Sequence, residues 1–563
     1  MKNLIRTAAL LAVVGVGAAC DLKVQNPNQP ETARVLATPA DVESLMASYY
    51  KRWHSGMWGT LSNIEGMANV QSFEDYSSLS NNCLGQRYGI PRPANDNSIG
   101  NGCAAEQLRV YAYMAETNRV ASSILGRLAT PGFTLGGASQ NNRAVAFSQF
   151  LRGISLGYLS LFYDSAAITT ATTPADSAGD LRSYVDVNAA ALVALQAAID
   201  AANASGTTST GFPLPGSWIP STTTMSQAEF IKLCHSYMAR FRAGVARTPT
   251  ERAAVNWATV ITDAQAGITA DHDNITNTVT GPFNSWLDAF YSYTTWHQMT
   301  PFIIGMADVS GSYKAWLAQP LASRGSGGAF FMQTPDLRWP QGATRAAQNA
   351  DFALAACNGA AQTCPRYFVN RPAGNDVASG SAWGLSNYDH ARFWSWRTSG
   401  DAGQARNGKL IFMSKTEISM LAAEGMIRTG NFAGALALIN QTRVPNGLAA
   451  LVAPDNTTPV PGGANCVPQI PIKANYQADG SFTAPQTTCG TMMEAMKWEK
   501  RMETAYTGFA QWFVDSRGWG DLVVGTGTTW PVPYQDLQAR LHNVYSTGGT
   551  INPYSAAQSG YGW

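Results

Sequence analysis

The chain has 563 residues, of which 45% are hydrophobic and 13% are charged, and its formal net charge is +1 at pH 7. This length allows a large hydrophobic core and more than one domain. The near-neutral charge gives no electrostatic reason to expect a nucleic acid or an anionic lipid surface as partner, so we expect no nucleic-acid binding.

The N-terminus has the features of a secretion signal. Lys2 and Arg6 precede an apolar run over 8–16, which is too short for a transmembrane helix. Small residues then lead into Cys20, as in a lipobox, so we predict a signal peptide at 1–19 and acylation of Cys20. The alternative is an ordinary signal peptide cut near Ala19, which leaves a free cysteine. Residues 20–40 then form the lipidated N-terminus and an extended tether, which anchors the chain to a membrane.

The remaining seven cysteines suggest three local disulfides. Six of them fall into close pairs within stretches rich in Gly, Pro and Asn, which predicts the bridges Cys83–Cys103, Cys357–Cys364 and Cys466–Cys489. Cys234 lies alone in an apolar helical run and is predicted to be a buried thiol. This pattern fits an oxidising compartment. No Cys-x-x-Cys is present and no histidine pairs with a cysteine at zinc spacing, so we expect no metal site.

Most of the remaining sequence has helical periodicity. A loop region over about 55–103 separates the first predicted helix from the others. The helices predicted in chain order are 41–53, 107–128, 142–163, 184–202, 226–245 and 256–268.

Residues 416–443 predict two further helices joined by a tight turn. Thr416 is a candidate cap of the first helix, Gly430 can adopt the left-handed conformation at its end, and Asn431 starts the second. The pattern resembles a tetratricopeptide hairpin, in which helix pairs stack and complete each other's buried face. We therefore predict a mainly α fold of stacked tetratricopeptide-like helix pairs.

The stretch Trp498–Leu522 is the most informative in the chain. Trp498, Met502, Ala505, Phe509 and Trp512 recur at spacings of four and three, which predicts that they share one face of a helix. Many charged residues stand beside this stripe, in the order Glu-x-Arg-x-Glu, then Gly508, Trp512, Asp515, Arg517 and Gly-Trp-Gly-Asp-Leu.

That order resembles the signature near the C-terminus of the SusD/RagB family. Three other blocks agree with the resemblance: Phe-Leu-Arg-Gly at 150–153, Ala-Glu-Gly at 423–425 and Trp-Pro-Val-Pro at 530–533. The resemblance covers roughly 20–560. It implies a single large domain over 41–563, belonging to an outer-membrane lipoprotein that faces the exterior. Such proteins bind glycans or other oligomeric nutrients without turnover and deliver them to a SusC-like TonB-dependent transporter.

The segment over about 270–410 is expected to be a loop-rich insert that binds the ligand. It carries many aromatic residues, whose flat faces can pack against the C–H faces of sugar rings. The candidates are Trp286, Tyr291, Trp296 and Trp316. The alternative for each of them is a place in the core.

Catalysis has little support, and we expect neither an enzyme nor a cofactor. The sequence lacks a Gly-x-Ser-x-Gly elbow, a His-Glu-x-x-His motif and a phosphate-binding loop. A secreted all-helical glycoside hydrolase is the main alternative, but it needs a pair of carboxylates, and no Glu occurs between Arg252 and Thr416. A structural or adhesive surface protein is the third possibility.

Overall fold

The computed structural model describes residues 35–59, 63–77, 89–174, 177–207, 210–221, 224–276, 283, 297–324, 330–358, 363–371, 386–394 and 408–549. The chain divides into two compact units, residues 1–45 and 46–563. Helix α3 starts in the first unit, and all later elements belong to the second. The predicted signal peptide and Cys20 lie outside the described residues.

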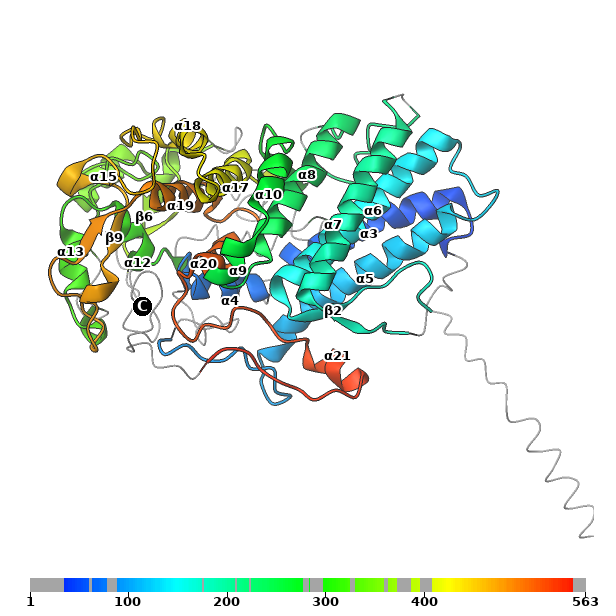
Figure 1. Ribbon diagram of the computed structural model, residues 1–563, viewed down its shortest axis with the longest axis horizontal. Helices are drawn as coiled ribbons and strands as arrows, with labels where there is room; N and C mark the ends of the chain where they lie inside the picture. Colours follow the sequence, from blue (N-terminus) through cyan, green and yellow to red (C-terminus); the bar gives the residue numbers. More distant parts are fainter. Residues whose placement is uncertain are drawn as a thin grey trace, which may run out of the picture. The chain divides into compact units, whose positions relative to one another are not determined.

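Helices dominate the second unit (Figure 1). The long helices are α3 (Pro39–Trp58), α5 (Ala104–Leu128), α6 (Ala138–Phe162), α7 (Tyr184–Ser205), α8 (Gln227–Gly244), α17 (Lys415–Arg428), α18 (Phe432–Arg443) and α19 (Met492–Thr504). The shorter helices are α4 (Ile64–Gln71), α9 (Pro249–Ala254), α10 (Trp257–Gln265), α12 (Pro301–Ile304), α13 (Ser312–Leu317), α14 (Leu321–Arg324), α15 (Arg345–Asp351), α20 (Gln511–Trp519) and α21 (Tyr534–Ala539). Single 3₁₀ turns are η2 (Gly305–Ala307), η3 (Leu354–Ala356), η4 (Gly463–Asn465) and η5 (Lys473–Asn475).

The strands are short and form antiparallel pairs. The pairs are β1 (Tyr76–Ser77) with β5 (His297–Gln298), β2 (Ser165–Ala167) with β3 (Leu181–Ser183), β4 (His272–Thr276) with β8 (Gly408–Met413), β6 (Phe368–Asn370) with β7 (Tyr388–His390), and β9 (Gln469–Pro471) with β10 (Thr487–Cys489). Two-stranded ribbons of this size do not build a hydrophobic core of their own. They instead hydrogen-bond two segments of the chain to each other. The predicted mainly α class is confirmed.

Several helices begin at a Ser or Thr that caps them, followed three residues later by an acidic residue. Ser183 Oγ accepts a hydrogen bond from the backbone N–H of Asp186, and Ser226 and Ser414 act in the same way for α8 and α17. Each cap satisfies one of the free N–H groups at a helix start and stabilises it by about 1 kcal/mol. The cap predicted at Thr416 is therefore wrong by two residues: the pattern that caps α17 is Ser414 with Glu417, and Thr416 lies within the helix.

Helices α5, α6, α7 and α8 lie side by side in a row that continues into α10 and α17 (Figure 1). The close approach of α6 to α8 depends on Gly157, because a Cβ there would lie 2.0 Å from the ring of Phe241. Helices α6 and α7 are long and apolar enough to cross a membrane by length and composition alone. In α6, 83% of the apolar stretch is buried within the chain, so we assign α6 as a core helix.

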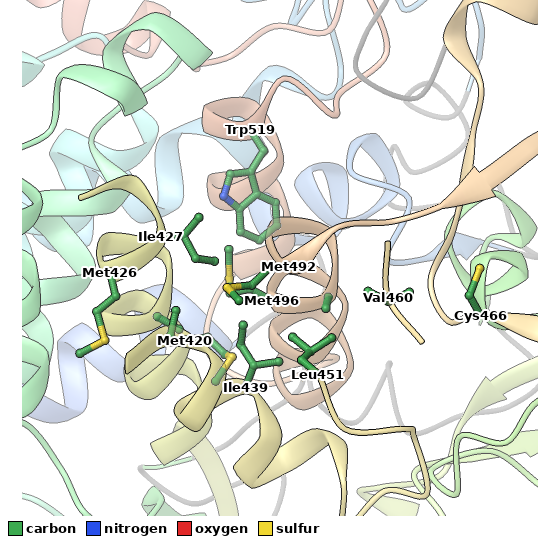
Figure 2. Packing of buried hydrophobic residues seen from close by; sticks show 13 residues of the cluster. Met420, Met426, Ile427, Ile439, Leu451, Val460, Cys466, Met492, Met496 and Trp519 are labelled. Atoms are coloured by element: carbon green, nitrogen blue, oxygen red, sulfur yellow. The ribbon is translucent and has the colours of Figure 1, made fainter. Parts of the chain in front are cut away.

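The predicted hairpin of α17 and α18 is confirmed. Gly430 adopts the left-handed conformation with φ +83°, and Asn431 caps α18 by accepting a hydrogen bond from the backbone N–H of Gly434. Figure 2 shows the cluster that this hairpin buries against α19 and the segment that follows α18. Ile439, Met496 and Leu451 are at most 6% exposed, so truncating any of them to alanine is expected to cost about 2–5 kcal/mol.

The single helix predicted across Trp498–Trp512 is wrong. Helix α19 ends at Thr504 and α20 begins at Gln511, and three residues between them are left-handed: Tyr506, Gly508 and Ala510, with φ of +55°, +70° and +50°. Left-handed residues cannot continue a right-handed helix. The apolar stripe is nevertheless buried, since Trp498 and Trp512 are each 1% exposed. Periodicity identified the burial and missed the break.

The charged residues beside this stripe form ion pairs inside the protein. Arg338 contacts Asp336, Glu499 and Glu503, with nitrogen–oxygen distances of 2.7, 3.0 and 3.1 Å. Lys500 pairs with Asp515 at 2.8 Å.

Further pairs connect α9 with α17 and α20 through Arg252, and α8 with α17 through Arg240. Arg252 contacts Glu424 at 2.6 Å and Asp515 at 3.3 Å, and Arg240 binds Glu417 through two bonds of 2.7 Å. We call the pairs centred on Arg338, Lys500, Arg252 and Arg240 the buried ion network. These four cations are at most 2% exposed, so each depends on its carboxylates to offset the loss of water.

Two other expectations need correction. The region over 55–103 is not all loop, because α4 follows the cap residue Asn63. The insert also contains the short helices α12 to α15 besides loops and strands.

The cysteine predictions fare better. The bridges Cys357–Cys364 and Cys466–Cys489 are confirmed, and Cys234 is a buried free thiol. Cys103 is disulfide-bonded, but Cys83 lies outside the described residues, so that pairing stays a prediction.

Candidate functional site

A pocket of about 370 Å³ opens in the predicted insert. Its lining residues are Val309, Gln333, Thr334, Pro335, Gln341, Gly342, Ala343 and Asn465. Three of them carry amide side chains and none carries a charge. We call this cavity the amide pocket.

Gln341 is the most firmly held of the three amides. Its Nε2 donates to the carbonyl oxygens of Asp336 at 3.0 Å and Trp339 at 2.8 Å, and its backbone N–H donates to Asp351 Oδ2 at 2.8 Å. Because these carbonyls occupy both amide hydrogens, Gln341 Oε1 remains as a fixed acceptor. No group in the part of the chain that the structure describes donates to it.

The other amides are unconstrained. The exposed side chains of Gln333 and Asn465 make no hydrogen bond within the described residues, so both can donate and accept. Thr334 adds a hydroxyl, whose oxygen accepts from the backbone N–H of Asp336 at 3.1 Å. Val309 and Pro335 supply apolar wall between the polar groups. A cavity with a few converging polar groups on an apolar wall is typical of small-molecule sites.

The rim of the pocket is fixed by local constraints. Gly342 has φ +132°, and a Cβ there would lie 2.7 Å from the Cβ of Ala347, so a larger residue is excluded. Its carbonyl oxygen accepts from Gln348 Nε2 at 2.9 Å. Another lining residue, Asn465, ends the turn η4 directly before Cys466, which is bridged to Cys489.

Two carboxylates stand behind the lining. Partial burial raises the pKa of Asp351, but hydrogen bonds from Arg366 and from the backbone of Gln341 outweigh it and hold that pKa below its usual range. Asp308 is 1% exposed and accepts from Gln333 N at 3.1 Å, Tyr313 N at 2.9 Å and both the backbone N–H and the hydroxyl of Ser310.

Of the four aromatic candidates, the structure describes only Trp316, and it is not among the lining residues of this pocket. Trp286, Tyr291 and Trp296 lie outside the described residues. Trp316 is 3% exposed on α13, where its ring lies 5.0 Å from that of Phe302 and 4.5 Å from the guanidinium of Arg324. A ring buried in this way has no free face for a sugar, so the structure places Trp316 in the core.

A second pocket of about 340 Å³ lies among α7, α8, α9 and α10. Its walls are mostly aliphatic, and its charged groups are already engaged: Arg242 pairs with Asp263 at 2.7 Å, and Glu251 accepts from the backbone N–H of Arg247 at 2.8 Å. This helical groove therefore offers fewer free polar groups than the amide pocket.

No protein-family model and no curated protein sequence matches the chain. Solved structures do. A SusD superfamily protein from Parabacteroides distasonis ATCC 8503 aligns over 93% of this chain and 100% of its own length, with a TM-score of 0.51 and 12% identity. A SusD homolog from the same organism aligns over 85% of each chain, with a TM-score of 0.50 and 13% identity. The chain has the SusD fold.

The resemblance inferred from the sequence is thus confirmed at the level of the fold. Within this SusD fold, the amide pocket was not foreseen, because isolated Gln and Asn residues in loops follow no spacing rule. The only nearby signal was Asp336-Leu337-Arg338, which the structure places directly behind the pocket, with Asp336 and Arg338 in the buried ion network.

Proposed function

We propose that this protein binds carbohydrate without turning it over. The observation that carries the proposal is the neutral chemistry of the amide pocket within a SusD fold. Sugar hydroxyls both donate and accept hydrogen bonds. An uncharged amide side chain can accept from such a hydroxyl through its oxygen and donate to it through its NH2 group. The fixed acceptor on Gln341 and the free amides of Gln333 and Asn465 meet this requirement.

We further propose that the protein is an outer-membrane lipoprotein, anchored through Cys20 and facing the exterior, that passes its ligand to a SusC-like TonB-dependent transporter. This part rests on the signal-like N-terminus and on the sequence resemblance. A Cys20→Ser variant should move from the membrane to the soluble fraction. Wild-type protein without an acyl mass on Cys20 would contradict the anchor. Co-purification with a β-barrel transporter from native membranes tests the partner.

The binding role can be tested by affinity gel electrophoresis of the full chain in gels that contain starch, dextran, xylan or galactomannan. We expect at least one polysaccharide to retard the protein. Gln333→Ala and Asn465→Ala should weaken retardation without changing the melting temperature, since neither side chain makes a hydrogen bond within the described residues. Gln196→Ala, on the exposed side of α7, is the matched control and should behave as wild type.

Three results would count against the proposal. Absence of retardation by every polysaccharide would contradict carbohydrate binding. Unchanged retardation of both pocket variants would move the site away from the amide pocket. Release of reducing sugar that stops when one aspartate is replaced would favour the glycoside hydrolase instead.

A further inference from the structure

We propose that the amide pocket selects uncharged sugars and rejects acidic ones such as uronic acids or sulfated sugars. This inference rests on the proposed carbohydrate-binding function and specifies its ligand class. It follows from the hydrogen-bond polarity of the lining and from the charge behind it.

The first observation is the polarity of Gln341. Its two amide hydrogens are held by the carbonyl oxygens of Asp336 and Trp339, so the group that it presents is an acceptor. A sugar hydroxyl can donate to this oxygen. An ionised carboxylate or sulfate has no hydrogen to donate, so its oxygens would face another acceptor at close range.

The second observation is the negative charge of Asp308. Asp308 directly precedes the lining residue Val309, and its carboxylate accepts a hydrogen bond from the backbone nitrogen of the lining residue Gln333 at 3.1 Å. No cationic side chain in the described ranges forms an ion pair with it, and it is 1% exposed, so neither a counter-charge nor water screens it well. This charge repels an anion in the pocket with less screening than between two charges in bulk water.

The neighbouring carboxylates differ from Asp308 because each contacts a cation, which Asp336 shares with Glu499 and Glu503. Asp336 is paired with Arg338 at 2.7 Å, and Asp351 is paired with Arg366 at 3.1 Å. Arg345 follows the rim residue Ala343 by two positions. Its guanidinium donates to the carbonyl oxygen of Arg371 at 3.1 Å and to Asn387 Oδ1 at 2.8 Å, and it is not among the lining residues. The uncompensated charge next to the pocket is therefore negative.

The test compares polysaccharides that differ mainly in charge. The probes are polygalacturonate with its fully methyl-esterified form, and carboxymethylcellulose with hydroxyethylcellulose, beside the neutral starch, dextran, xylan and galactomannan gels. We expect the full chain to bind at least one neutral probe and Asn465→Ala to weaken that binding roughly tenfold, as for the loss of a good hydrogen bond. Acidic probes should show no binding that depends on Asn465.

A charge-gain variant makes the test sharper. Asn465→Lys adds a cation to the exposed lining of the pocket and should strengthen binding to at least one acidic probe about tenfold or more over wild type. Asn465→Ala is its matched control and should gain none. Melting curves of both variants should match wild type, since the Asn465 side chain makes no hydrogen bond in the described structure.

The outcomes separate this inference from the proposed function. Binding of wild type to an acidic probe that Asn465→Ala abolishes would overturn the selectivity while leaving carbohydrate binding in place. Failure of Asn465→Lys to gain an acidic probe would also overturn it. If no probe of either kind retards wild type, the proposed function fails, and the selectivity fails with it.

Discussion

The buried ion network and the amide pocket differ in where they keep charge. The network places full charges in the interior, where Arg252, Arg240 and their carboxylates are almost completely enclosed. The pocket, which faces solvent, is lined by neutral amides and aliphatic groups. The charges of the network thus connect elements in the interior, whereas the amide pocket is lined by uncharged groups.

This difference between the network and the pocket shows that a recognisable sequence motif can identify a fold without identifying the ligand. The charged signature over 498–522 connects α19 to Arg338 of the insert, to α20 and to Asp521, and none of these ion pairs leaves a free charged group for a ligand. It specifies the fold. In the function proposed above, the ligand is bound by loop residues such as Gln333 and Asn465, whose side chains have no role in that framework.

The largest expected effect comes from breaking the network at Arg338. Arg338→Ala leaves Asp336, Glu499 and Glu503 buried without this cation, which should lower the free energy of unfolding by about 3–5 kcal/mol. Urea denaturation measures the change. Arg366→Ala is the control, because its pair with Asp351 is partly exposed and should contribute less than about 1 kcal/mol. Equal losses for the two variants would mean that burial does not distinguish these pairs.

The pH dependence of the network should appear at Glu424. Burial raises the pKa of this carboxyl, but Arg252, Arg428 and Lys500 outweigh it and lower the pKa from its ordinary value of 4.5 to about 2. Its contribution to stability is therefore complete above pH 4.5 and is lost as the pH falls toward 2.

Glu424→Gln should accordingly cost about 3 kcal/mol at neutral pH, and its difference from wild type should shrink between pH 4.5 and 2. Unfolding titrations of both proteins at several pH values measure this. Glu229→Gln, which removes an exposed pair with Lys232, should cost less than about 1 kcal/mol at neutral pH. A gap at Glu424 that stays constant down to pH 2 would contradict the assignment.

The disulfide beside the pocket should have a smaller effect. Cys466 and Cys489 are separated by 23 residues, so replacing both by serine should cost about 2–3 kcal/mol by freeing that loop in the unfolded chain. The same variant should also weaken polysaccharide binding, because Asn465 precedes Cys466. Calorimetry and affinity electrophoresis measure the two effects. Loss of stability with unchanged binding would show that the bridge does not position the pocket.

The smallest effect should come from the pocket itself. Asn465→Ala and Gln333→Ala should change the free energy of unfolding by less than about 0.5 kcal/mol, as surface substitutions usually do. Their effect should appear in ligand binding, at about 1 kcal/mol for one lost hydrogen bond. A drop in melting temperature of several degrees would instead place these side chains in the framework.

The helices of the fold were predictable because their determinants are local. Periodicity and caps such as Ser226 with Glu229 fixed most helices to within a few residues. The errors arose where conformation overrides periodicity. The apolar stripe over 498–512 continues across residues that are left-handed in the structure, and Ala510 carries no sign of that in its identity.

The candidate site was less predictable, because what makes it a site is three-dimensional. Gln341 differs from other glutamines only through the carbonyls that hold its amide, and Asn465 joins it from 124 positions away (465 − 341). Aromatic enrichment favoured Trp316, but that ring satisfies packing among Phe302, Tyr313 and Arg324. Composition cannot distinguish an aromatic ring that is packed in the core from one that is exposed to a ligand.

The long sequence separations within the network imply an order of events during synthesis. Arg240 precedes Glu417 by 177 residues, and Arg252 precedes Asp515 by 263. At about 5–20 residues per second, a ribosome needs on the order of 13–50 s to supply the second partner. The early helices must wait through that interval with their arginines uncompensated. A nascent chain that stops at residue 413 should therefore be digested rapidly by a protease, and a chain that continues to residue 549 should be resistant.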